Sequence, residues 1–210
     1  LEAGYAIWPG VSDEVLAGCL RLTEARVEGG GTRRLFERIP QLADLLVDVN
    51  AGSDMVLCRM LAYVQPPVAV LEQMLTLRLH LDPCGPDKGP LRVLPGSHRL
   101  GKLSAEQIQH QVRSQVAVEC LCEAGEILAM RPLLVHSSGS ALRPGRRRVI
   151  TLSFALPEQS RFPAEIGGFE EVAPALGQAF VVAFSLQVEG QGLVVLLVDQ
   201  AGLEGYLRFL

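Results

Sequence analysis

Residues 89–98 read Gly-Pro-Leu-Arg-Val-Leu-Pro-Gly-Ser-His, and this stretch decides the fold expected for the chain. It predicts a strand that runs into a turn at Pro95-Gly96. A second pair of strands is expected at residues 133–139 and 149–154, with the basic run Arg-Arg-Arg at residues 146–148 leading into the later one. The chemistry expected of the chain depends on the residues at the ends of these strands.

His136 lies at the end of one strand of that pair, and Arg147 opens the next strand. The arrangement suits a metal-bound 2-oxo acid, because an imidazole binds the metal while a guanidinium holds the distal carboxylate with two parallel hydrogen bonds. Lysine cannot supply that paired contact. Alternation along the strand puts Arg147 on the side of His136 and turns Arg146 and Arg148 away. The alternative interpretation of the basic run is a solvated turn.

Over roughly residues 4–155 the chain resembles the phytanoyl-CoA dioxygenase family of non-haem iron oxygenases. Residues 87–98 and 136–147 carry the resemblance. It implies an oxidoreductase, a dioxygenase that uses Fe(II), 2-oxoglutarate and O2 to hydroxylate a small-molecule substrate. It further implies that His136 is a metal ligand, that Arg147 anchors 2-oxoglutarate, and that no catalytic residue exists beyond the metal site. Phytanoyl-CoA itself is not implied as the substrate.

Many short strands, Gly and Pro turns and a few N-terminal helices predict the fold. Residues 75–81 alternate leucine with Thr76, Arg78 and His80, which is typical of a strand with one apolar face. Further strands are expected near residues 116–121, 126–130, 133–136 and 148–155, and helices at residues 12–27, at 33–47 with a break at Pro40, and at 104–114 behind a capping box. The fold class is therefore mainly β with N-terminal helices (α+β), a double-stranded β-helix or cupin-like jelly roll.

A chain of 210 residues is long enough for one core, so we expect a single jelly-roll domain over residues 1–210. The family resemblance fades after Phe162, which leaves residues 163–210 as an unmatched C-terminal extension. Two apolar runs between Ala179 and Val198 are joined by Glu-Gly-Gln-Gly. They predict a hairpin that is added to the barrel or extends its sheet.

Composition excludes several classes of protein. An apolar content of 49% with 20% charged residues is that of a globular protein rather than a disordered one. A net charge of −4 argues against a nucleic-acid partner. Apolar runs fall short of the ~20 residues that a membrane span needs. Five cysteines without framework spacing predict a reduced, cytoplasmic protein, with Cys120 and Cys122 as buried small apolar residues.

The iron ligands are harder to assign. Such a site needs two His and one carboxylate on one face of the metal. His80-Leu81-Asp82, followed by His136, meets that requirement on spacing, and His80 and Asp82 share a strand face. The family resemblance instead places the His-x-Asp motif between Arg59 and Pro66, where the chain reads Met-Leu-Ala-Tyr-Val-Gln. The expected motif is absent there.

Three explanations remain open for that absence. The sequence omits a segment, in which case we expect a break or disorder between about Arg59 and Gln65. Alternatively, His80 and Asp82 have taken over as ligands. The third explanation is a true deletion, which would leave a catalytically silent jelly-roll binding or scaffold protein. A metal-binding cupin such as an isomerase is a weaker interpretation, because it would need further His ligands and the chain has 4 His.

Other polar residues are candidates for ligand contacts. Ser138 is positioned to hydrogen-bond 2-oxoglutarate, or else to satisfy backbone groups in a turn. Arg78 shares a strand face with His80 and is a candidate for binding a substrate carboxylate or phosphate. His98 is expected to order the loop at the barrel mouth, with substrate contact as the alternative. His110 is expected on the solvent face of its helix.

Overall fold

The computed structural model describes residues 1–24, 38–46, 49, 56–57, 59–60, 67–143, 145–155, 169–170 and 183–184. The helices are α1 (Asp13–Glu24), α3 (Gln41–Leu46), α4 (Val68–Leu71) and α5 (Ala105–Ser114), with short 3-10 helices η1 (Pro86–Lys88) and η2 (Ser97–Leu100). The strands are β1 (Tyr5–Trp8), β2 (Val56–Leu57), β3 (Arg59–Met60), β4 (Leu75–His80), β5 (Leu91–Val93), β6 (Val118–Cys120), β7 (Ile127–Met130), β8 (His136–Ser138), β9 (Val149–Ala155), β10 (Phe169–Glu170) and β11 (Ala183–Phe184).

The strands form two antiparallel sheets that face each other. The larger sheet has the order β1-β7-β4-β9-β11, with β2 also paired to β9, and the smaller has the order β6-β5-β8. The chain crosses between the sheets after β4, β6, β7 and β8, so neighbouring segments alternate between the two layers. That connectivity makes a jelly roll and confirms the predicted fold class. A separate short pair joins β10 to β3.

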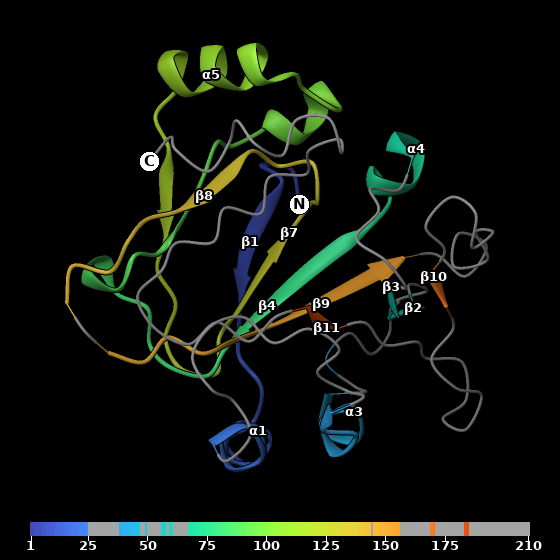
Figure 1. The fold of residues 1–210 in the computed structure, drawn as a ribbon, viewed down its shortest axis with the longest axis vertical. Coiled ribbons are helices and arrows are strands. Elements are labelled where there is room, and N and C mark those ends of the chain that lie inside the picture. The colour runs from blue at the N-terminus through green and yellow to red at the C-terminus, as the bar shows by residue number, and fades with distance from the viewer. Residues whose placement is uncertain are drawn as a thin grey trace.

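The outer face of the larger sheet packs against α1 and α3, which lie together on one side of it in Figure 1. Leu75, Leu77 and Leu79 of β4 are buried there, as the leucine alternation predicted. Their partners in this core come from the neighbouring strands and the two helices: Ile127, Ala129, Ile150, Leu152, Phe154, Cys19, Leu42 and Leu46. Each fully buried leucine contributes about 1.5–3 kcal/mol, so this layer fixes which face of β4 looks away from the helices.

A second core fills part of the space between the sheets. Leu128 and Met130 of β7 point inward from the larger sheet and meet Leu91 and Val93 of β5. Cys120 and Cys122 are also buried in this core, 1% and 3% exposed, as the sequence predicted. The inward faces of the two sheets therefore share an apolar core.

The three helix predictions are confirmed where the structure describes them. α1 begins after Ser12, whose hydroxyl accepts a hydrogen bond from the Val15 backbone N–H at 3.4 Å. Residues 25–37 lie outside the described part, and within the predicted second helix α3 begins directly after Pro40. α5 opens with the predicted capping box between Ser104 and Gln107.

The strand predicted at residues 133–136 is wrong. Residues 132–134 form a turn in which the Leu134 N–H bonds to the Arg131 carbonyl, and the strand starts only at His136. Pro132 has no backbone N–H to give to a ladder, which favours the turn. The shift matters because it makes His136 the first residue of β8.

At the C-terminal end, β11 pairs with β9 and so lies at the edge of the larger sheet. The rest of the predicted hairpin at residues 179–198 lies outside the described residues. Within the described ranges, no helix has the length and apolarity required to cross a bilayer.

Candidate functional site

The inner face of the larger sheet carries a row of polar side chains. Thr76, Arg78 and His80 alternate with the leucines of β4, so they point away from the helices and toward the smaller sheet. The register sets Arg78 beside Thr151 of β9, and Thr76 beside Ser153. Thr151 and Ser153 are buried. A buried polar row opposite a purely apolar face indicates that this side of the sheet lines a site.

Across from that row, β8 turns His136 and Ser138 inward. The register pairs His136 with Val93 and Ser138 with Leu91, and both apolar partners belong to the inner core. Leu134 O lies 2.6 Å from His136 Nδ1. If Nδ1 carries the proton and donates it to this carbonyl, Nε2 keeps a lone pair that suits a metal. Burial lowers the pKa of His136 and the Arg78 charge lowers it further, against the Leu134 carbonyl, which favours this neutral ring.

Arg147 reaches the same place from the turn before β9. Its Nη1 donates to the Ser138 hydroxyl at 3.1 Å, to the Lys88 carbonyl at 3.1 Å and to the Gly89 carbonyl. Gly89 holds a left-handed φ of 64°, and a Cβ there would meet the Gly139 carbonyl oxygen at 2.2 Å. Only glycine fits this close approach, which brings the two carbonyls to the guanidinium.

Half-buried Arg78 and buried His80 have polar atoms without partners among the described residues. Arg78 Nε and both ring nitrogens of His80 have no hydrogen-bond partner among the described residues. Burial, then the charges of Arg78 and Arg147, lowers the pKa of His80 to about 3, so the ring is neutral at pH 7. Burial and the Arg147 charge lower the pKa of Arg78 to about 10, which leaves it charged.

Thiols, rather than carboxylates, surround the Arg78 guanidinium. Besides Arg147, the groups whose charge would act on Arg78 are Cys84, Cys122 and Cys120. Burial raises the pKa of Cys120 to about 11 and that of Cys122 to about 12, so these thiols stay neutral. Burial also raises the pKa of Cys84, against the opposing charge and hydrogen bond of Arg147. The described part of the interior is therefore net positive.

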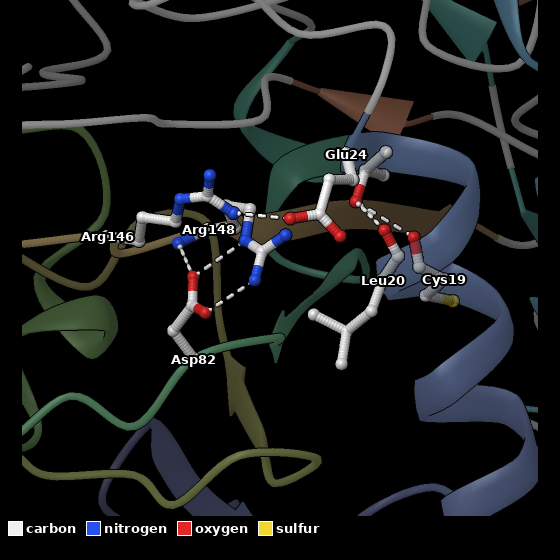
Figure 2. Close-up of polar contacts among 7 residues, drawn as sticks. Cys19, Leu20, Glu24, Asp82, Arg146 and Arg148 are labelled. Carbon is white, nitrogen blue, oxygen red and sulfur yellow. Dashed lines mark hydrogen bonds and ion pairs between the residues drawn. The ribbon is translucent and has the colours of Figure 1, made fainter.

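Asp82 lies on the other side of the sheet from His80. The chain bends at residues 81–82, directly after β4 ends. There the Asp82 carboxylate accepts from Arg148 at 2.9 Å (Nε) and 2.7 Å (Nη2), and from its backbone N–H at 2.8 Å. Figure 2 shows this pair beside the exposed Arg146–Glu24 pair at the end of α1. Burial acts to raise the pKa of Asp82, but the Arg148 hydrogen bonds outweigh it and lower the pKa.

Two further histidines lie on η2 and α5, outside the strands that carry this polar row. His98 lies in η2 against Gly4, where a Cβ would come within 2.4 Å of its Nδ1. Besides burial, the groups that lower its pKa are Arg99, Arg131 and the N-terminal amine, and they do not include Arg78 or Arg147. His110 is exposed on α5, as predicted. The substrate contact considered for His98 stays a prediction.

The described residues do not make a complete iron site. The chain has 4 His, and of these His80 and His136 face the interior. No group of three His, Cys, Asp or Glu suited to a metal occurs among the described residues. His80 and Asp82 are not brought together, since Asp82 is bound to Arg148. The break expected between Arg59 and Gln65 falls on residues outside the described part, except for Arg59 and Met60 in β3.

Three residues of the site were not predicted from the sequence. Thr151 and Ser153 alternate with Ile150, Leu152 and Phe154 in β9, and this pattern was a usable signal. Cys84 joins the interior because its backbone pairs with that of Cys122, at 2.8 Å from Cys84 N to Cys122 O. No local pattern marks a contact between two such distant loops.

A comparison with protein families finds one match that spans this interior. The family model described as phytanoyl-CoA dioxygenase (PhyH) matches residues 53–149. The matched segment contains Arg78, His80, His136, Ser138 and Arg147. A comparison with curated proteins finds no match.

Solved structures with the same fold include several oxygenases. EctD from S. alaskensis in its apoform has a TM-score of 0.61 and 16% identity, over 86% of this chain and 83% of that chain. EctD with 2-oxoglutarate and 5-hydroxyectoine gives 0.61 and 18%, over 82% and 78%. The non-heme alpha ketoglutarate dependent carbocyclase SnoK from nogalamycin biosynthesis gives 0.59 and 14%, over 82% and 90%. At these identities the likeness establishes the fold alone.

Proposed function

We propose that this chain, which belongs to the phytanoyl-CoA dioxygenase family through residues 53–149, is an Fe(II)- and 2-oxoglutarate-dependent dioxygenase that hydroxylates a small-molecule substrate with O2. The observation that carries the proposal is the contact between Arg147 and Ser138 inside the jelly roll. It brings a guanidinium and a hydroxyl together between the two sheets. His136 lies on the same strand and the same face as Ser138.

In this proposal the chain's residues hold 2-oxoglutarate at its distal carboxylate. Arg147 supplies charge-assisted hydrogen bonds, and Ser138 adds a hydroxyl donor beside it. The Lys88 and Gly89 carbonyls hold the Arg147 guanidinium in place, so little side-chain entropy is lost when the ligand binds. Burial between the two sheets excludes water and strengthens these contacts.

The iron part of the proposal rests on the family, with His136 as the ligand that this chain supplies. EctD has been solved with bound Fe, and that structure has the same fold with 17% identity. The incomplete ligand set among the described residues favours a second candidate function. In that alternative the protein is a catalytically silent jelly roll that binds a 2-oxo acid or related dicarboxylate.

One experiment separates the two candidates. The purified chain is incubated with Fe(II), ascorbate, O2 and labelled 2-oxoglutarate, with and without EDTA, and labelled succinate is measured. Succinate release that depends on Fe(II) and is lost in the His136→Ala variant supports the dioxygenase. If 2-oxoglutarate binds but Fe(II) adds no succinate release, the silent binding protein is the correct interpretation.

A cytoplasmic location goes with this proposal. Cys84, Cys120 and Cys122 are free and buried near one another, which fits a reducing compartment.

A further inference from the structure

The interior contains a guanidinium that the proposed function leaves without a role. Arg78 comes from the middle of β4, two residues before His80, and faces the smaller sheet. Its charge acts on both His136 and His80, so it lies within electrostatic reach of both imidazoles. Arg147 in turn acts on Arg78. Arg78 therefore lies near the other candidate ligand-binding residues, between the two sheets.

It costs free energy to remove an N–H group of a charged side chain from water without giving it a hydrogen-bond partner. Leaving one polar group of a charged side chain unsatisfied costs at least as much as a lost hydrogen bond. Arg78 Nε has no hydrogen-bond partner among the described residues, and the same is true of both nitrogens of His80, which is 2% exposed. Such groups are rare in native proteins, and a missing ligand is one physical explanation for them.

The sign of the charge on a ligand that would bind Arg78 follows from the groups around Arg78. Among the described residues, the titratable groups that act most on the pKa of Arg78 are Arg147 and the neutral thiols Cys84, Cys122 and Cys120. Asp82, which is the first carboxylate in the chain after β4, forms an ion pair with Arg148 instead. An anion is the ligand that suits the Arg78 guanidinium, and a carboxylate matches the guanidinium fork.

We propose that Arg78 and Arg147 form a two-point clamp for a small dicarboxylate inside the jelly roll, and that this clamp binds its ligand without a metal ion. Arg147 and Ser138 hold one carboxylate, and Arg78 holds the other. His80 lies next to Arg78 as a neutral hydrogen-bonding group. The inference rests on the proposed binding of 2-oxoglutarate at Arg147, and it explains how the chain holds the ligand although its described residues supply an incomplete iron site.

The test is calorimetric titration of the full-length chain in EDTA with glutarate, 2-oxoglutarate and butyrate. We expect glutarate and 2-oxoglutarate to bind, and butyrate, which has one carboxylate, to bind at least tenfold more weakly. Butyrate binding equal to that of glutarate would overturn the clamp. So would a wild-type chain that binds 2-oxoglutarate only after Mn(II) replaces EDTA.

Variants of Arg78 test whether its side chain binds the second carboxylate of the ligand. In Arg78→Gln we expect at least a tenfold loss of glutarate affinity and an unchanged butyrate affinity, while Arg78→Lys retains part of the glutarate affinity. Arg92→Gln is the matched control, because Arg92 lies exposed on the outer face of the smaller sheet, paired with Glu119. Glutarate affinity in Arg78→Gln equal to that of the control sinks the proposal.

A stability readout guards against a variant that fails to fold. Because Arg78 Nε has no hydrogen-bond partner among the described residues, Arg78→Gln should unfold at the same temperature as the ligand-free wild type or at a higher one. Glutarate should raise the unfolding temperature of the wild type and leave that of Arg78→Gln unchanged. A glutarate-induced rise that persists in Arg78→Gln, and equally in the more conservative Arg78→Met, would contradict the clamp.

The results also separate this inference from the proposed function. Arg78-dependent binding in EDTA with no Fe(II)-dependent succinate release would leave the clamp in place and favour the silent binding protein. Fe(II)-dependent succinate release with unaltered binding in Arg78→Gln would leave the dioxygenase in place and remove the clamp.

Discussion

Arg147, in the turn before β9, contacts Ser138 of β8 inside the jelly roll, with 3.1 Å between Arg147 Nη1 and the Ser138 hydroxyl oxygen. Ser138 in turn donates to the Gly89 carbonyl at 3.3 Å, and Arg147 donates to the same carbonyl. The three groups form a closed polar contact between β8, the turn before β5 and the turn before β9. In the proposed function, this contact is where the distal carboxylate of 2-oxoglutarate binds.

Replacing Arg147 with alanine should weaken 2-oxoglutarate binding severely. A buried carboxylate that loses its guanidinium partner costs about 2–5 kcal/mol, or roughly 30-fold and more in Kd. Calorimetric titration of the variant measures the loss. Arg146→Ala is the matched control, since its side chain is exposed and paired with Glu24 on the far side. Equal affinities in the two variants would show that Arg147 does not anchor the ligand.

His136 and His80 should differ in their effect on iron. We expect His136→Ala to abolish Fe(II)-dependent succinate release and His80→Ala to reduce it much less. His136 presents a ring whose Nδ1 contacts the Leu134 carbonyl, whereas no carboxylate among the described residues completes a ligand pair with His80. Iron binding and succinate release are measured on both variants. Equal loss of iron binding in both would make His80 a ligand and contradict this assignment.

His80 should make the protein less stable as the pH falls. Its pKa is about 3 in the folded protein and about 6.5 in an unfolded chain. Between these values the unfolded state binds more protons, so stability is full above about pH 6.5 and declines by up to about 1.4 kcal/mol per pH unit down to about pH 3. Urea unfolding of wild type and His80→Leu from pH 7 to pH 4 measures the difference, because other groups contribute to both proteins. Parallel curves would refute the buried neutral imidazole.

The Asp82–Arg148 pair should behave as a structural contact. Its side chains are 16% and 10% exposed, and removing one partner of a largely buried pair costs about 3 kcal/mol. Asp82→Asn should therefore lower the unfolding temperature strongly, while 2-oxoglutarate affinity in the folded variant stays at the wild-type value. Glu24→Gln, which removes an exposed partner of Arg146, should change neither. A selective loss of metal or ligand binding in Asp82→Asn would return Asp82 to the candidate site.

Gly89 should tolerate alanine less well than Gly96 does. Both have a positive φ, 64° and 79°, but an added Cβ meets the Gly139 carbonyl oxygen at 2.2 Å in the first case and nothing within 4 Å in the second. Backbone strain of about 1–2 kcal/mol is common to both. Gly89→Ala should also displace the carbonyls that hold Arg147 and so weaken 2-oxoglutarate binding. Affinity in Gly89→Ala equal to that in Gly96→Ala would show that the turn does not position Arg147.

Much of the fold could be read from local patterns. The leucine alternation of residues 75–81 was enough to predict β4 and its two faces, because side chains in a strand point to opposite sides. Ser104 and Gln107 predicted the start of α5, since their reciprocal hydrogen bonds involve only neighbours in the chain. The same alternation placed Arg147, rather than Arg146 or Arg148, on the inner side.

The spacing of His80 and Asp82 did not predict their positions correctly, because β4 ends at His80. His80 and Asp82 would share a face if the strand continued, but the chain bends at residues 81–82 and carries Asp82 to Arg148. The ion pair stabilises this bend from a segment far along the chain, which no local pattern shows. The turn at Pro132 had a similar effect on the start of β8.

The sequence by itself determined which residues face the interior, because that depends on the two-residue period of a strand and on the apolar residues that helices cover. The tertiary structure alone decided which of those residues meet. Arg78 comes within reach of both His136 and Arg147 because β4 and β9 pair in one sheet while β8 belongs to the sheet opposite. The grouping of these side chains is therefore a property of how the two sheets pack, since it depends on contacts between residues that are distant in the chain.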